Sequence, residues 1–310
     1  MVTTEIAEKI KRLEEKYAAM GQSLSAYLDG LLYADYLTYW DYINLDVLLN
    51  LQQPRTPIPD ENIFIIYHQI TELYFKLALQ AISQMCEGDA PASAEVMSTQ
   101  LRRINNYFRN LVSSFEIMVE GMDKEQFLQF RMALLPASGF QSGQFRMIEI
   151  CSTDLLQLVY EPQRAPLAGT GLKDRLDHIY WRSGATELAT GKKTLTLRQF
   201  ELKYMEPFLK LATNYELCNV RARFLQLPEP ERAAVIPLLK EYDLNINVRW
   251  PLMHYKSAVR YLHKKPEDIA ATGGTNWQQY LPPKNKRIVF FPELWSEEEL
   301  SNWGKLAMGE

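Results

Sequence analysis

The sequence predicts an all-α protein, because apolar residues recur every three or four positions along most of the chain. Charged residues lie between them, as on amphipathic helices. Proline and glycine interrupt this pattern at intervals, most clearly within residues 127–149, where a helix, a tight loop and a second helix follow one another. Together these observations favour a bundle of helices.

Length and composition exclude several classes of protein. The chain has 310 residues, 47% apolar and 23% charged, which suffices for one large domain or one with an inserted subdomain. The net charge of -4 with scattered Lys and Arg argues against a nucleic-acid partner. Cys86, Cys151 and Cys218 are far apart and odd in number, which predicts a reducing cytoplasm. No signal region or run of about eighteen apolar residues is present, so we expect neither export by that route nor a membrane span.

The first fifty residues predict two helical regions. An amphipathic opening helix follows from Ile6, Ile10, Leu13 and Tyr17, which repeat at helical spacing. Residues 24–52 form a longer region that is apolar on more than one face, so it is either buried or docks on another subunit. Aromatic residues crowd within it, as they do in cores and interfaces: Tyr36, Tyr39, Trp40 and Tyr42.

Residues 63–79 predict a central helix with almost no polar face. Asp60 is placed to cap this helix, as Ser93 is for the next one. Phe64, His68 and Glu72 are spaced one turn apart and share a stripe. From the pattern alone, a histidine in a buried helix is most often bonded to a neighbour as a structural residue.

The central stretch combines a helix break with a positioned arginine. Pro136 cannot continue the first helix, Gly139 permits unusual backbone angles and Ser142 is a good N-cap for the second helix. Asp123 is placed to cap the helix that contains Arg131. The planar guanidinium of Arg131, one turn before the break, could clamp a carboxylate. A surface arginine beside an ordinary turn is the alternative that the pattern leaves open.

The remainder of the chain predicts a linker, a subdomain and a second helical region with a candidate functional histidine. Residues 161–173 are rich in Pro and Gly and predict a loop, followed to Leu227 by less apolar helices in which His178 is exposed. Residues 231–265 predict two helices or one broken helix, because they contain Pro237 and Pro251. One face of the second part carries Trp250, His254, Ser257 and Tyr261. On this pattern alone, His254 is a core or surface histidine.

Several segments resemble the tryptophan 2,3-dioxygenase family of all-helical haem enzymes. The most specific is PASGFQSGQFR at 136–146, with FRMAL before it at 130–134. The matches run from Tyr36 to Trp295 and are loose in the middle of the chain. The other matching segments are YLTYWDYINLDVLLNLQQP (36–54), FIIYHQITELYFK (64–76), WPLMHYKSAVRYL (250–262), ATGGTNWQQYL (271–281) and FFPELW (290–295).

The resemblance implies a haem b cofactor between the helix of His68 and the helix of His254, with His254 as the iron ligand. It places Ser138, Gly139 and Trp250 at the cofactor. The implied substrates are L-tryptophan and dioxygen, and both oxygen atoms enter the indole C2–C3 bond to give N-formylkynurenine. This reaction belongs to tryptophan catabolism by the kynurenine pathway.

The resemblance also implies a role for each substrate residue. His68 is the catalytic residue that accepts the indole N–H and orients the ring, Phe64 stacks on the indole, and Phe127 lines the pocket. Arg131 and Thr272 hold the carboxylate. The implied assembly is a homotetramer, a dimer of dimers, in which a neighbouring subunit contributes Tyr39, Tyr42 and Ile43 to the pocket.

The chain departs from the family pattern near two of these residues. Leu252 and Met253 stand where the family usually has basic residues, and Pro251 beside them is unusual. Ala271 replaces a usual glycine, and the interval from His254 to Thr272 is longer than in bacterial relatives. We therefore expect differences in how the haem propionates are held and how the loop at 271–281 closes.

The predicted organisation has three parts. Residues 1–160 contain the interface helices and the substrate half of the haem domain, 161–230 an inserted small helical subdomain, and 231–310 the proximal helix and the remaining half. Two alternatives to the dioxygenase stay open. One is a related haem monooxygenase of secondary metabolism that acts on a tryptophan- or tyrosine-like substrate, and the other is a non-catalytic haem- or tryptophan-binding sensor.

Overall fold

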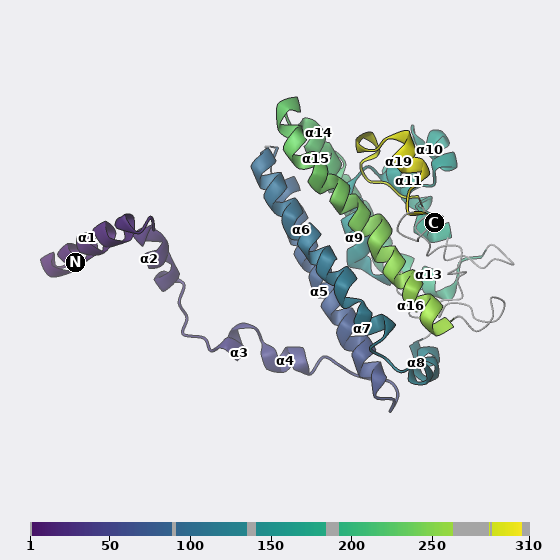
Figure 1. Cartoon of the computed structure of the whole chain (residues 1–310), viewed down its shortest axis with the longest axis horizontal. Helices are drawn as coiled ribbons and strands as arrows, with labels where there is room; N and C mark the ends of the chain where they lie inside the picture. The colour runs from purple at the N-terminus through teal and green to yellow at the C-terminus, as the bar shows by residue number, and fades with distance from the viewer. Residues whose placement is uncertain are drawn as a thin grey trace. The chain divides into compact units, whose positions relative to one another are not determined.

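The fold is all-α, as predicted (Figure 1). The computed structural model describes residues 2–88, 91–134, 141–183, 192–262, 285 and 287–305. Within these ranges an isolated β-bridge joins Val159 and Ile179, and no strand is present. None of the helices in the described part of the chain has the length and apolar character needed to cross a membrane.

The chain divides into two compact units, Met1–Gln53 and Pro54–Glu310. None of the described residues of the first unit is buried. Its predicted long helical region is broken, because Tyr36 and Asn44 have positive φ angles of 55° and 51°, which a right-handed helix does not contain. The helices of this unit are α1 (Thr4–Ala19), α2 (Leu24–Leu32), α3 (Tyr39–Tyr42) and α4 (Leu45–Leu49).

The second unit holds the hydrophobic core. Its elements are α5 (Asp60–Cys86), α6 (Ala94–Ser114), α7 (Glu116–Val119), α8 (Lys124–Phe130), η1 (Arg131–Leu134), α9 (Gly143–Ser152), η3 (Leu155–Leu158), α10 (Glu161–Leu167), α11 (Leu172–Asp177), α12 (Tyr180–Ser183), α13 (Leu195–Tyr215), α14 (Val220–Gln226), α15 (Glu229–Leu244), η4 (Asn245–Arg249), α16 (Trp250–Leu262), η5 (Pro292–Leu294) and α19 (Glu297–Ser301).

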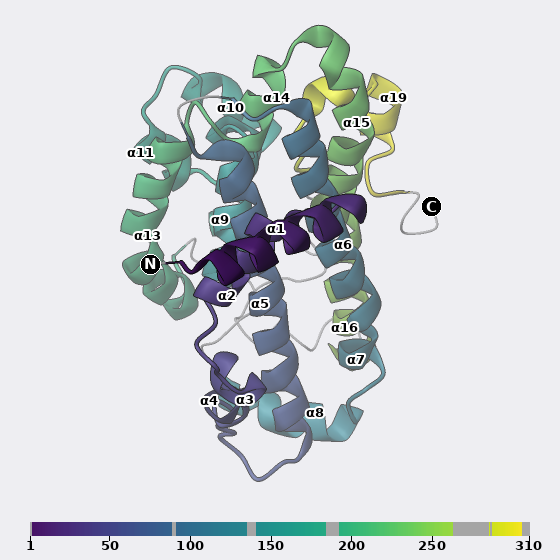
Figure 2. The same ribbon diagram turned by 90° about the vertical axis from the view of Figure 1, so that its left-hand side faces the viewer.

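Helix α5 is central to this unit, as predicted. It packs against α6 on one side and against α9 on the other; α6 in turn packs on α15, and α9 on α13 (Figure 2). Tyr67, Phe75 and Ile82 are among its buried residues. Its opposite face is an exposed apolar stripe, defined by Ile66, Ile70, Leu73 and Leu77.

Three of the four predicted helix caps are confirmed. The side chains of Ser93, Asp123 and Ser142 accept hydrogen bonds from the first turns of α6, α8 and α9. The prediction for Asp60 is wrong, because α5 already includes Asp60 and follows Pro59. The Asp60 carboxylate instead accepts a hydrogen bond from the backbone N–H of Asp123 at 2.6 Å.

The predicted loop at 161–173 is also wrong in part, because residues Glu161–Leu167 form α10. Pro162 lies in the first turn of this helix, where no backbone N–H donor is needed. Arg164 fastens the helix to the preceding segment by donating to the carbonyl of Val159 at 2.8 Å and that of Gln157 at 3.0 Å. His178 is exposed, as predicted.

The predicted break before His254 is a π-helical turn, η4, rather than a proline kink. Helix α15 continues through Pro237, and Pro251 is the second residue of α16, so neither proline interrupts a helix. Buried amides fix the π-turn: Asn245 donates to Asn105 of α6 at 3.1 Å. The segments from Glu229 to Leu262 thus form consecutive helical elements with one local change of winding.

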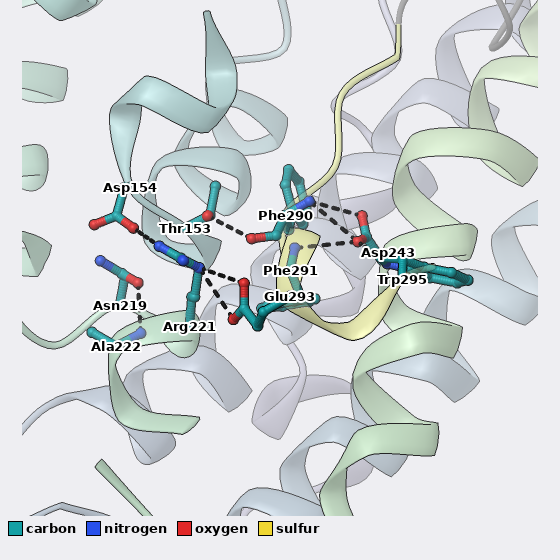
Figure 3. Close-up of polar contacts among 10 residues, drawn as sticks. All are labelled: Thr153, Asp154, Asn219, Arg221, Ala222, Asp243, Phe290, Phe291, Glu293 and Trp295. Carbon is teal, nitrogen blue, oxygen red and sulfur yellow. Dashed lines mark hydrogen bonds and ion pairs between the residues drawn. The ribbon is translucent and has the colours of Figure 1, made fainter. Parts of the chain in front are cut away.

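A buried carboxylate ties the C-terminal segment to these helices (Figure 3). Asp243 accepts hydrogen bonds from the backbone N–H groups of Phe290, at 3.0 and 3.2 Å, and Phe291, at 3.3 Å. The indole N–H of Trp295 and the amide of Asn247 donate to it at 3.0 and 2.8 Å. The matched segment FFPELW therefore begins with a buried stretch and one turn of η5, and α19 follows.

A second polar contact holds the same segment from the other side. Arg221 of α14 donates to both carboxylate oxygens of Glu293, at 3.0 and 3.2 Å, and forms an ion pair with Asp154 (Figure 3). Thr153 donates to the carbonyl of Phe290 at 2.7 Å. The C-terminal segment is thus joined to α9, α14 and α15.

We expect the stability contributed by Asp243 to depend on pH. Burial raises the pKa of Asp243 to about 6, although the N–H donors oppose this rise. The folded-state pKa of Asp243 lies above its ordinary value. The stability that Asp243 contributes is therefore complete below pH ~4 and is lost as the pH rises through about 6. The gap in the free energy of unfolding between the wild-type chain and Asp243→Asn should therefore shrink by roughly 2–3 kcal/mol over this window.

Urea denaturation at a series of pH values measures this gap. Every other carboxylate titrates equally in both chains, so the subtraction isolates Asp243. A gap that stays constant from pH 4 to 7 would contradict the prediction.

Candidate functional site

His68 is a neutral imidazole with a fixed tautomer. Its Nδ1 lies 2.7 Å from the carbonyl oxygen of Phe64, one turn earlier in α5. A carbonyl only accepts, so Nδ1 carries the hydrogen and Nε2 keeps a lone pair. Burial lowers the pKa of His68, although Glu72 and the Phe64 carbonyl oppose this. Nε2 of His68 can therefore accept a hydrogen bond at neutral pH.

A group of aromatic rings extends from His68 through Phe64 to α8. The Phe64 ring centroid lies 4.0 Å from that of His68, 6.4 Å from that of Phe127 and 5.8 Å from that of Phe130. The structure thus brings together the predicted residues Phe64, His68 and Phe127. Phe130 completes this aromatic group and was not predicted.

Arg131 is buried, which rules out the surface arginine that the pattern left open. It is the first residue of η1, directly after α8, and only 6% of it is exposed. Burial lowers the pKa of its guanidinium, which nevertheless remains a cation at physiological pH. The Asp123 cap at the start of α8 fixes the helix that places it. A buried, planar cation that directly follows Phe130 in the chain is suited to a ligand with both a carboxylate and a ring.

His254 presents the second imidazole, on α16. Its Nδ1 lies 3.1 Å from the carbonyl oxygen of Trp250, so by the same argument Nε2 carries the lone pair. The rings of Trp250 and Phe115 lie 4.6 and 4.7 Å from that of His254. A helix-borne imidazole with this tautomer can act as a metal ligand.

The face predicted for α16 is confirmed by its contacts. The Ser257 hydroxyl donates to the carbonyl of Met118 at 3.5 Å, and the Tyr261 hydroxyl lies 3.1 Å from the carbonyl of Val119. Trp250 packs edge-on against Phe115. This face therefore meets α7 and the residues that follow it.

Aromatic contacts link the surroundings of the two histidines. Tyr67, the neighbour of His68 on α5, has its ring 5.7 Å from that of Phe115, which in turn contacts His254. A second route runs from Phe64 through Phe127 to Tyr261 of α16. The two imidazoles thus belong to one aromatic region of the second unit.

Gln144 of α9 is a polar contact that sequence reasoning missed. Its amide donates to the carboxylate of Glu72 at 2.8 Å and to the backbone carbonyl of Glu72 at 2.9 Å. It thereby joins α9 to α5, one turn beyond His68. The sequence shows that Glu72 lies one turn after His68. The partner of Glu72, Gln144, is 72 positions further along the chain.

The remaining predicted residues belong to the first unit or fall outside the described residues. Ser138, Gly139 and Thr272 lie outside the described residues. Tyr39 and Tyr42 belong to α3 in the first unit and are 71% and 75% exposed. Ile43 follows α3 and is also exposed.

Comparisons with known proteins agree on one family. The family model described as tryptophan 2,3-dioxygenase matches residues 31–159. A tryptophan 2,3-dioxygenase of Anaeromyxobacter sp. (strain K) is 38% identical over 276 residues, which cover 84% of this chain and 94% of that protein. One of Ruegeria sp. (strain TM1040) is 28% identical over 280 residues, covering 85% and 92%. One of Herpetosiphon aurantiacus is 42% identical over 115 residues, covering 36% and 44%.

Proposed function

The chain belongs to the tryptophan 2,3-dioxygenase family of oxidoreductases, and from that premise we propose that it inserts both atoms of dioxygen across the indole C2–C3 bond of L-tryptophan. The product is N-formylkynurenine, and the cofactor is haem b. The observations that carry the proposal are neutral His68 beside the ring of Phe64, the contact of that ring with Phe127, and the burial of Arg131, one turn after Phe127 in the chain. This grouping matches an amino acid with an aromatic N–H group and a carboxylate.

The residues around His254 fit a haem. A porphyrin already supplies four nitrogens to its iron, so the protein needs to provide one strong ligand from a rigid element. His254 offers Nε2 from α16, and Trp250 and Phe115 provide apolar rings beside it. Ser138 and Gly139 are further proposed contacts of the cofactor. When bound, the haem supplies the activation of dioxygen.

The protein's own residues bind and orient the substrate. The Nε2 lone pair of His68 accepts the indole N–H and so fixes the rotation of the ring. Phe64 and Phe127 exclude water from its faces. Arg131 holds the carboxylate through paired, charged hydrogen bonds, and Thr272 contributes to the same group. These contacts would fix the orientation of C2 and C3 of the indole in the pocket.

We further propose that the chain is a homotetramer in which a neighbour's first unit completes each site. In the described part of the first unit, residues 2–53, no residue is buried, and large apolar side chains are exposed, including Tyr39, Tyr42 and Ile43. The second unit exposes the apolar stripe of α5, defined above. Large exposed apolar patches on a protein normally mark protein interfaces. The three-part organisation at 1–160, 161–230 and 231–310 belongs to the same proposal, as does a cytoplasmic location. The cysteines are all free thiols.

A complementation experiment tests the shared site. We expect Tyr42→Ser to raise KM for tryptophan by about tenfold, because one aromatic wall is lost. Arg131→Ala inactivates the pocket of its own chain at low tryptophan. At low tryptophan, mixed tetramers from co-expressed Tyr42→Ser and Arg131→Ala chains should be more active than either variant alone, since some sites combine an intact Arg131 with a neighbour's intact Tyr42. Mixed tetramers no more active than the average of the parents would contradict sharing.

Product mass tests the reaction itself. The haem-loaded chain is reduced without oxygen and then given L-tryptophan and air. A product heavier by two oxygen atoms, with the indole ring opened, supports the dioxygenase. A gain of one oxygen atom would assign the chain to the monooxygenases. Tryptophan binding without turnover would assign it to sensors.

A further inference from the structure

We infer that Tyr261 of α16 is a positioning residue for substrate binding. It fixes the position of Phe127, a residue of α8, in the proposed tryptophan pocket. This inference rests on the proposed function. Tyr261 lies on α16, two turns after His254 and on the same face. It is almost completely buried, with 1% of its surface exposed. One side chain thus connects the helix of the proposed iron ligand to the substrate wall.

The ring of Tyr261 contacts Phe127 directly. Their centroids are 4.6 Å apart at an interplanar angle of 44°. Phe127 also contacts Phe64 and Phe130, so it lies between Tyr261 and the proposed indole site. Any shift of Tyr261 therefore reaches the substrate through Phe127.

The hydroxyl of Tyr261 fixes the chain that leads into α8. It lies 3.1 Å from the carbonyl of Val119, the last residue of α7, and 3.2 Å from that of Met122. A hydroxyl has one hydrogen, so it donates to one of these carbonyls at a time. Carbonyls at helix ends lack partners within the helix, which makes such a side-chain donor valuable. Asp123 follows at once and caps α8.

The two contacts of Tyr261 act on the same short segment. The hydroxyl holds the connection before α8, and the ring supports Phe127 within α8. A second link between α16 and this connection is the ion pair of Arg260 with Glu120 at 3.1 Å. Both partners of that pair are exposed, so it holds the segment only weakly. Tyr261 is therefore a buried anchor of the segment that carries Phe127, beside the hydrogen bond of Asp123 to Asp60 of α5.

Tyr261→Phe tests this role, because it keeps the ring and removes only the hydroxyl. The matched control is Tyr242→Phe on α15, which removes an equally buried hydroxyl bonded to Ser152 at 2.6 Å. We expect Tyr261→Phe to raise KM for L-tryptophan by about threefold to tenfold, the effect of one neutral hydrogen bond, with little change in kcat. Tyr242→Phe should lower thermal stability similarly and leave KM unchanged.

A double-mutant cycle with Phe127→Leu shows whether the effect passes through Phe127. We expect the double variant to have a KM no higher than that of Phe127→Leu alone. Hydrogen exchange gives a readout without turnover: the amides of residues 119–127 should exchange faster in Tyr261→Phe than in Tyr242→Phe. Additive effects on KM, or equal exchange in the two variants, would overturn the inference.

The wild-type chain, measured in the same assay, separates the two proposals. If it turns over tryptophan and Tyr261→Phe leaves KM unmoved, the inference fails and the proposed function stands. If the wild-type chain does not oxidise tryptophan, the proposed function fails, and the inference fails with it.

Discussion

Replacing His254 by alanine should remove the haem and lower tryptophan turnover on the order of 10³-fold or more, the scale seen when an essential group is deleted. The reason is that His254 Nε2, with its lone pair fixed by the Trp250 carbonyl, is the proposed ligand that would hold the haem iron. Absorbance in the Soret region of the purified chain measures the retained haem, and the mass assay measures turnover.

His178→Ala is the matched control. His178 makes the same kind of local contact, with Nδ1 2.8 Å from the carbonyl of Asp174 one turn earlier, but it is exposed. We expect it to leave haem content and turnover unchanged. His254→Gly with added imidazole should regain part of the Soret absorbance, because the free base replaces the lost ligand. A His254→Ala chain with normal haem content and spectrum would remove His254 from the iron.

Replacing Arg131 by alanine should raise KM for L-tryptophan by about 10- to 100-fold with a smaller change in kcat. A charged hydrogen bond is worth roughly 1.5–3 kcal/mol, and its loss weakens substrate and transition state together. Arg131→Lys keeps the charge without the planar fork, so its KM should lie between that of the wild-type chain and that of Arg131→Ala. Initial rates over a range of tryptophan concentrations give both constants.

Tryptamine makes the test of Arg131 specific, since it lacks the carboxylate. The wild-type chain should prefer tryptophan to tryptamine, and Arg131→Ala should lose most of this preference. Thermal unfolding of each variant shows whether the loss of a buried side chain has damaged the fold. An unchanged KM in a folded variant would remove Arg131 from the carboxylate site.

The sequence predicts local relationships well because they depend on short spacing. Phe64 and His68 are one helical turn apart, and the structure confirms their contact at 4.0 Å. Ser93 and Ser142 cap helices as predicted, because an N-cap bonds to residues two or three positions ahead. The burial of Arg131 could be anticipated only through the family resemblance, since its spacing also fits a surface residue.

Relationships between distant positions could not be predicted from spacing. Phe115 belongs to an ordinary apolar pattern, and nothing in the sequence pairs it with His254, far along the chain. Asp60 looks like a cap for its own helix but bonds to Asp123, 63 positions later. Asp243 is likewise paired with Phe290 only in the folded chain. These side chains found partners through packing rather than through local propensity.

The π-turn η4 sets the rotational phase of everything that follows it in α16. Each residue of an α-helix advances the direction of its side chain by about 100° around the axis. A π-turn closes its hydrogen-bonded ring over one more residue than an α-turn, so it shifts that direction for the rest of the helix. Deleting one residue of Asn245–Arg249 would turn Trp250, His254 and Tyr261 together away from their present neighbours. The orientation of the proposed iron ligand and that of the Phe127 anchor are therefore set by the same five residues.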